Sequence, residues 1–174
     1  MDFAQPNSTS TEVSAPTIVG STEFVTIEGI SNIPAKIDTG ADSSSVWVSD
    51  LDVSKDGVLS FALFGQNSSL YSGERIERKD FSVAVVRSSN GHEQVRYRTK
   101  LTLELGGKTL DTTFTLASRE KNHFPVLVGR KTLNHGFLVD VSIRKVEKPQ
   151  NPATPRLNDE LKRDPYLFHQ KHFN

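Results

Sequence analysis

The sequence predicts an all-β protein, either a barrel or a sandwich. Residues 95–105 alternate between apolar and polar side chains, which is the period of two expected of a strand with one buried face. Gly106 and Gly107 follow, and two adjacent glycines suit a two-residue hairpin turn because both accept a positive φ. The other apolar runs are short, and altogether we count seven or eight strands and one short helix.

The first two expected strands form a pair. Residues 23–30 alternate between apolar and polar side chains, and residues 33–37 can pair with them across a loop that contains Gly29. Gly136 is placed to end the short helix as a C-terminal cap. The remaining expected elements follow in order: strands at 58–64, 80–86, 95–105, 108–117 and 125–128, the helix at 130–136, and a closing strand at 137–146.

The expected organisation is one domain between two tails. Residues 1–16 are rich in Ser, Thr and Pro, which predicts a flexible N-terminal tail. The domain spans 17–147. Prolines interrupt the pattern in 148–174, so we expect a polar C-terminal tail with at most a brief helix at 157–164.

The composition excludes several classes of protein. The 21 basic and 21 acidic residues balance, which argues against a nucleic-acid binder. The chain has no apolar run of 18 residues, so we expect no membrane span. It has no cysteine, which removes disulfides and thiol catalysis. The N-terminus does not look like a signal peptide, so we expect a cytoplasmic protein, or a periplasmic one if a signal peptide has been removed.

The main candidate for chemistry is Asp38, in the sequence Asp-Thr-Gly-Ala at the end of the apolar run 33–37. Asp, Thr and Gly are common turn residues, and an ordinary Asx turn explains them without catalysis. A carboxylate between two apolar segments would, however, be held rigidly and partly desolvated, which favours acid–base chemistry. Residue types alone leave both interpretations open.

A second sequence motif bears on the role of Asp38. The segment "VLVGRKTLNHG" lies about ninety residues after "AKIDTGADSSSV". Together they resemble the retropepsin-like aspartic proteases, and more narrowly the bacterial family known as ATP-dependent zinc proteases. The resemblance covers about residues 18–146. It implies a closed β-barrel of the retropepsin type with one short C-terminal helix.

The resemblance assigns roles to residues of both motifs. It implies that Asp38 is the catalytic carboxylate, that the Thr39 hydroxyl bridges to the partner motif, and that Gly40 tightens the turn. Ala41 and Asp42 would contact substrate. Asp42 would also form a partly buried salt bridge with Arg130, which follows Gly129 and gives structural support.

An aspartic protease needs two carboxylates, about 3 Å apart, that share one proton. This chain has one Asp-Thr-Gly, and "LDTTF" at 110–114 lacks the glycine and lies within a strand. We therefore expect a C2 homodimer that contributes one Asp38 from each chain.

The sequence supports neither zinc nor ATP binding, and we expect no metal and no cofactor. It contains no His-Glu-x-x-His motif and no phosphate-binding loop. His169 and His172 have helical spacing but lie in the tail without an acidic ligand nearby. Any ATP dependence would come from a partner, such as the ATP-grasp glutamate ligases with which this family is associated.

The basic stripe Arg96, Arg98 and Lys100 has two interpretations. Such a stripe is usually a solvated strand face. Alternatively it attracts an acidic peptide or protein substrate, and the resemblance then favours Arg96. The leading hypothesis is thus a homodimeric aspartic endopeptidase. The alternative is a non-catalytic binding module on the same fold, a partner of a glutamate ligase.

Overall fold

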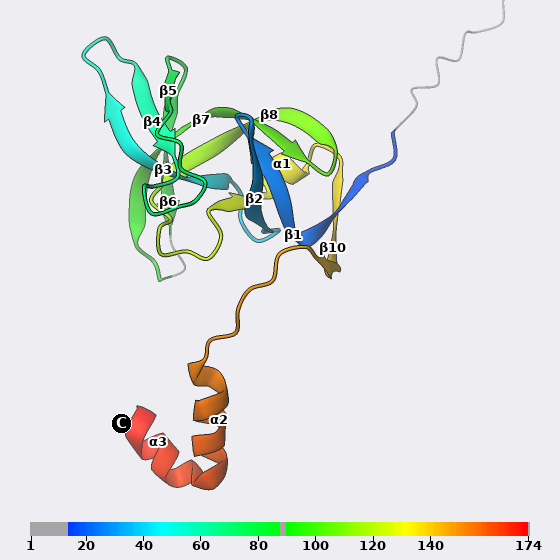
Figure 1. The fold of residues 1–174 in the computed structure, drawn as a ribbon, viewed down its shortest axis with the longest axis vertical. Coiled ribbons are helices and arrows are strands. Elements are labelled where there is room, and N and C mark those ends of the chain that lie inside the picture. The colour runs from blue at the N-terminus through cyan, green and yellow to red at the C-terminus, as the bar shows by residue number, and fades with distance from the viewer. Residues whose placement is uncertain (1–13, 88–89, 174) are drawn as a thin grey trace, which may run out of the picture.

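The computed structural model describes residues 14–87 and 90–173, and strands are the main regular structure of this part of the chain (Figure 1). The predicted N-terminal tail lies mainly outside the described residues. In chain order, the elements are β1 (Thr17–Ile27), β2 (Ile30–Ile37), β3 (Ser44–Val53), β4 (Leu59–Leu63), β5 (Arg75–Arg78), β6 (Ser82–Arg87), β7 (Glu93–Leu105), β8 (Lys108–Ala117), β9 (Val126–Val128), α1 (Arg130–Leu133), β10 (Phe137–Arg144), α2 (Ala153–Arg163) and α3 (Pro165–Phe173).

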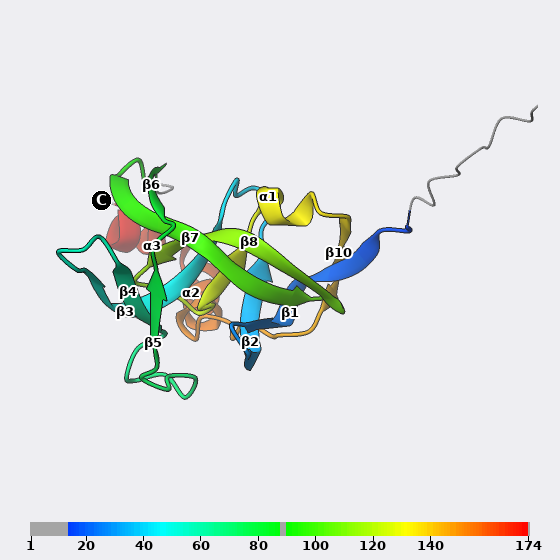
Figure 2. The same cartoon turned by 90° about the horizontal axis from the view of Figure 1, so that it is seen from above.

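Six strands pair in a ring, in the order β1, β2, β9, β3, β8 and β7. The ring closes because Thr26 and Ile27 of β1 pair with β7. β10 adds to β1 in parallel and β6 adds to β7, while β4 and β5 extend from β3. Figure 2 shows β7 and β8 lying side by side along the molecule, as their long antiparallel register requires.

The core fills the inside of this ring. Leu101, Leu103 and Leu105 of β7 are at most 1% exposed, as their alternation predicts. Val95, on the same face of the strand, is 67% exposed because the β6–β7 hairpin extends past the core. The other residues of the core come from every strand of the ring, among them Val25, Ile27, Ile33, Ile37, Val46, Phe114, Leu116, Val126 and Val128.

The predicted hairpins form. β1 and β2 pair antiparallel, and the turn between β7 and β8 holds Gly106 and Gly107 at φ values of 58° and 79°. The described residues contain ten strands, more than the seven or eight predicted. One reason is that β5 lies within a polar segment, for which the sequence predicts a loop.

The C-terminal segment differs from the prediction of a polar tail with at most one brief helix, since it forms two helices, α2 and α3. Its prolines begin these helices: Pro152 is the N-cap of α2 and Pro165 is the first residue of α3. Neither helix buries a residue, and Figure 1 shows both at one end of the molecule, apart from the strands. None of the described helices has the length and apolar composition needed to cross a membrane.

Candidate active site

Asp38 follows the last residue of β2, and its backbone N–H donates to the carbonyl of Val128 in β9, at 2.9 Å. One carboxylate oxygen, Oδ1, accepts hydrogen bonds from the backbone N–H groups of Gly40 (3.0 Å) and Ala41 (3.2 Å). The side chain remains 26% exposed. The local geometry is therefore an Asx turn that fixes the carboxylate while leaving it accessible.

The other carboxylate oxygen has a cationic neighbour that the sequence interpretation overlooked. Lys36 Nζ lies 3.6 Å from Asp38 Oδ2. The two residues are two positions apart at the end of a strand, so alternation places their side chains on one face. That spacing was visible in the sequence and could have identified Lys36.

The turn after Asp38 is tied to the segment that begins α1. The backbone N–H of Arg130 donates to the Ala41 carbonyl at 2.8 Å. The Arg130 guanidinium donates to the carbonyls of Thr39 and Gly40 at 3.1 and 3.2 Å. The structure thus joins two sequence motifs about ninety residues apart, and Arg130 braces the turn that carries Asp38.

Gly129 permits this close approach. A Cβ at this position would lie 2.6 Å from the backbone carbonyl atoms of Ser43, closer than Cβ atoms approach such groups. The Gly129 N–H donates to the buried hydroxyl of Ser44, which in turn lies 2.6 Å from the Thr132 hydroxyl. A buried polar network therefore fixes the two motifs relative to each other.

Asp42 lies between two cations. Its carboxylate is 3.7 Å from the Arg130 guanidinium and 2.8 Å from Lys131 Nζ. The ion pair with Arg130 is present, but the side chains are 52% and 60% exposed, so the expectation of a partly buried bridge is wrong. The hydrogen bond from Lys131 is the main cause that lowers the pKa of Asp42. Lys131 is the closer partner, and the sequence reasoning missed it.

Thr39 is exposed, and within the described part of the chain its hydroxyl makes no hydrogen bond. The role implied for it, a bridge to a second copy of the motif, involves an atom outside a single chain. The hydroxyl is accessible for such a contact.

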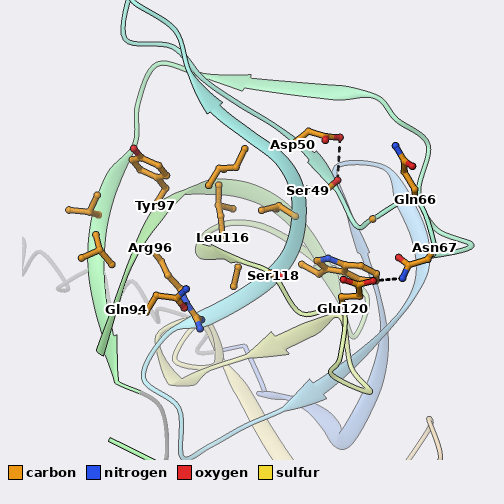
Figure 3. Close-up of a pocket in the computed structure, with 17 residues that line it drawn as sticks. Ser49, Asp50, Gln66, Asn67, Gln94, Arg96, Tyr97, Leu116, Ser118 and Glu120 are labelled. Atoms are coloured by element: carbon orange, nitrogen blue, oxygen red, sulfur yellow. Dashed lines mark hydrogen bonds between the residues drawn. The ribbon is translucent and has the colours of Figure 1, made fainter. Parts of the chain in front are cut away.

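A cavity of about 840 Å³ opens between β3, β7 and the loop after β8, and no residue of the Asp38 turn lines it. Figure 3 shows Arg96 and Gln94 on one side, with Asn67 and Glu120 hydrogen-bonded to each other on the other side. The rest of its lining includes the apolar side chains of Trp47, Val48, Leu51, Val83, Val95, Tyr97, Leu116 and Ala117. Arg96 thus belongs to this cavity, whereas Arg98 and Lys100 line a different one, of about 490 Å³.

Arg119 lies in the loop between β8 and β9, between Ser118 and Glu120, which line the 840 Å³ cavity. Its Nε donates to the Phe124 carbonyl at 3.1 Å. Burial lowers the pKa of Arg119, the charge of Arg96 lowers it further, and the charge of Asp38 raises it. Arg119 is therefore within electrostatic reach of both residues. No pattern in the sequence pointed to Arg119, because the loop "SREKNHF" has no periodicity.

The part of the chain that the structure describes contains no group of three His, Asp or Glu side chains that could hold a metal ion. His172 lies 3.3 Å from Glu160, and the His169 ring stacks on Phe173. Both histidines take part in contacts within the α2–α3 hairpin.

A mostly β chain with Asp-Thr-Gly at one strand end, braced by Gly-Arg at another, has the organisation of a retropepsin-like protein. The family model described as "Retropepsin-like aspartic endopeptidase RimB" matches residues 18–150. The chain belongs to this RimB-like family. The match does not bear on the name ATP-dependent zinc protease.

The curated relatives of this chain are named as ligases and not as endopeptidases. Proteins named "Probable alpha-L-glutamate ligase" from Shewanella pealeana and Desulfotalea psychrophila are 30% and 26% identical over 130 and 135 residues. These regions cover 72% and 75% of this chain but only 28% and 29% of the relatives. The chain therefore spans less than a third of the length of these relatives.

A solved structure shares the fold. It is a protein of unknown function from Legionella pneumophila, 24% identical, with a TM-score of 0.58. The match covers 73% of this chain and 95% of the Legionella protein. At this identity the likeness concerns the fold alone.

Proposed function

We propose that this chain is an aspartic endopeptidase in which two Asp38 carboxylates, one from each subunit of a homodimer, activate a water molecule. The observation that carries the proposal is the geometry of Asp38. Two backbone N–H groups hold one oxygen, and the supporting turn is locked to Gly129 and Arg130. A catalytic carboxylate needs such a fixed but accessible position.

The chemistry follows from the repulsion of two close carboxylates, which share one proton. The ionised carboxylate takes a proton from the attacking water, while the protonated one donates to the carbonyl oxygen of the scissile peptide bond. Collapse of the tetrahedral intermediate breaks the C–N bond, and a proton moves to the leaving amine. Thr39 and Gly40 shape the turn, and Ala41 and Asp42 border the substrate.

The direct test is Asp38→Asn, assayed on a mixed peptide library from pH 4 to 7. Because the amide cannot act as a general acid or base, we expect hydrolysis to fall by at least about a hundredfold. Thermal unfolding of the variant controls for loss of structure. Hydrolysis at the wild-type rate by a folded variant would refute the proposal.

A second candidate function is a non-catalytic binding module that docks on a glutamate ligase. The names of the curated relatives favour it, since the region similar to this chain is part of longer proteins named as ligases. We expect the two partners to meet in the cytoplasm. Isothermal titration with a glutamate ligase tests this: tight binding with no hydrolysis by wild type would favour the module over the peptidase.

A further inference from the structure

We propose that Lys36 is a positioning residue whose charge allows two Asp38 carboxylates to meet at the axis of the homodimer. This role rests on the proposed peptidase function and deepens it, because assembly of the two-carboxylate site then depends on Lys36. The lysine takes no part in the acid–base steps. It offsets the negative charge that two neighbouring Asp38 side chains bring together.

The position of Lys36 follows from the place of β2 in the ring. Lys36 pairs with Thr22 of β1 on one side and with Leu127 of β9 on the other, so both neighbouring strands fix its backbone. Asp38 follows two residues later, and the alternation of side chains along a strand directs both residues onto one face. Lys36 Nζ accordingly lies 3.6 Å from Asp38 Oδ2. A fixed backbone therefore keeps the cation beside the carboxylate.

The cation is close to the carboxylate but leaves its outer oxygen open. The backbone N–H groups of Gly40 and Ala41 donate to Oδ1, and in residues 14–87 and 90–173 no donor makes a hydrogen bond to Oδ2. At 3.6 Å, Lys36 Nζ is beyond the ordinary length of a hydrogen bond to Oδ2, while its charge still acts at that distance. Oδ2 can therefore contact a water molecule or a second carboxylate.

The isolated chain gains little from Lys36. Its side chain is 53% exposed, and within the described residues Asp38 is the one acidic group at ion-pair distance from it. Exposed ion pairs of this kind have small effects on the stability of a folded chain. The charge is placed beside the carboxylate that the proposed mechanism uses, so we assign it to the assembly of the site rather than to the fold.

Association of two chains would change the charge balance around Asp38. Each chain brings one accessible carboxylate, and a C2 axis near Asp38 would place the two side by side, where like charges repel. The proton that they share removes one of the two negative charges. Each chain also brings its own Lys36, and the two cations offset the charge that remains. Without Lys36, the repulsion between the carboxylates opposes dimer formation.

The test is a double-mutant cycle on self-association, with the dissociation constant of the dimer measured by sedimentation of a dilution series at pH 7 and low ionic strength. We expect Lys36→Met to weaken the dimer at least about tenfold, because the repulsion is no longer offset. In the Asp38→Asn background, which lacks the carboxylate charge, the same change should alter the dissociation constant less than about threefold.

Three further variants separate charge from other effects. Lys36→Arg keeps the cation and should keep wild-type association. Lys36→Gln removes the charge but stays polar, so it should weaken the dimer as Lys36→Met does even if the exposed methionine lowers solubility. Lys55→Met is the matched control, because Lys55 is an exposed lysine in the turn between β3 and β4, and its removal should leave association unchanged.

Hydrolysis gives a second readout. Lys36→Met should lose activity on dilution and recover it when concentrated, because association and not the chemical step is impaired. Equal weakening of the dimer with and without the Asp38 carboxylate, or no weakening at all, would overturn the proposal. A wild-type chain that stays monomeric at every concentration would also overturn it. Coupling between Lys36 and Asp38 in a dimer that hydrolyses no peptide would instead refute the peptidase function and leave the role of Lys36 in assembly standing.

Discussion

At the scale of single residues, the pKa of Asp42 is a measure of the contacts around the Asp38 turn. The hydrogen bond from Lys131 lowers the pKa of its carboxyl, with smaller effects from the charges of Lys131 and Arg130. We expect Lys131→Met to raise this pKa toward its ordinary value, measured by carbon-detected NMR titration. Asp140 is an internal control, because its pKa is lowered by Ser142 and should not move.

The lowered pKa of Asp42 makes the free energy of unfolding depend on pH, because proton binding and folding are linked. A carboxyl whose pKa is lower in the folded state contributes stability above its unfolded pKa, and loses it as the pH falls through the folded pKa. The acid side of the stability profile should therefore be flatter in Lys131→Met than in wild type. An unchanged Asp42 titration in this variant would show that the 2.8 Å contact does not persist in solution.

The sequence was a good guide to residues within motifs and a poor one to residues outside them. Asp38, Gly129 and Arg130 lie in recognisable patterns, and the structure brings the three together. Arg119 could not be found, because its relation to Asp38 arises from the path of a loop between two strands. Long-range electrostatic neighbours of this kind need the tertiary structure.

At the scale of elements, a buried acid attaches the last strand to the first. Glu23 of β1 is 2% exposed. One carboxylate oxygen accepts from the Gly20 N–H at 2.7 Å, and the other lies 2.7 Å from Lys145 Nζ, just after β10. This contact anchors the end of β10, from which the linker to α2 departs.

We expect Glu23→Ala to lower the free energy of unfolding by about 1–3 kcal/mol, because the buried Gly20 N–H loses its acceptor. Chemical denaturation measures this change. Glu147→Ala is the matched control, because Glu147 is exposed, and we expect a change within about 0.5 kcal/mol. Equal stabilities of the two variants would mean that Glu23 does not anchor β10.

The elements themselves were predictable where the period was clear. The alternation of β7 and the Gly106-Gly107 turn fixed the β7–β8 hairpin, because both signals are local. β5 was missed because its residues, Arg75–Arg78, are mostly polar and its pairing with β4 is a tertiary event. The ring closure through β1 and β7 likewise depends on strands about 75 residues apart, for which a single sequence has no signal.

At the scale of the whole molecule, the single Asp-Thr-Gly motif constrains the assembly. Within the described chain, the cationic Lys36 is the one partner within ion-pair distance of the Asp38 carboxylate, and a cation cannot serve as the second acid–base group of the proposed mechanism. Activity should therefore need a second copy of the chain. In such a C2 dimer both copies of Asp38 would lie near the axis and together form a single active site.

This requirement can be tested by mixing subunits. A hybrid of one wild-type and one Asp38→Asn chain has a single catalytic carboxylate, so it should be inactive. If the subunits exchange freely, an excess of the variant converts wild-type chains into hybrids, and we expect activity per wild-type chain to fall in proportion to the wild-type fraction. The same excess of an unrelated protein should have no effect. Activity that stays constant, while sedimentation of differently labelled chains shows that hybrids form, would mean that one Asp38 suffices and that the two-carboxylate mechanism is wrong.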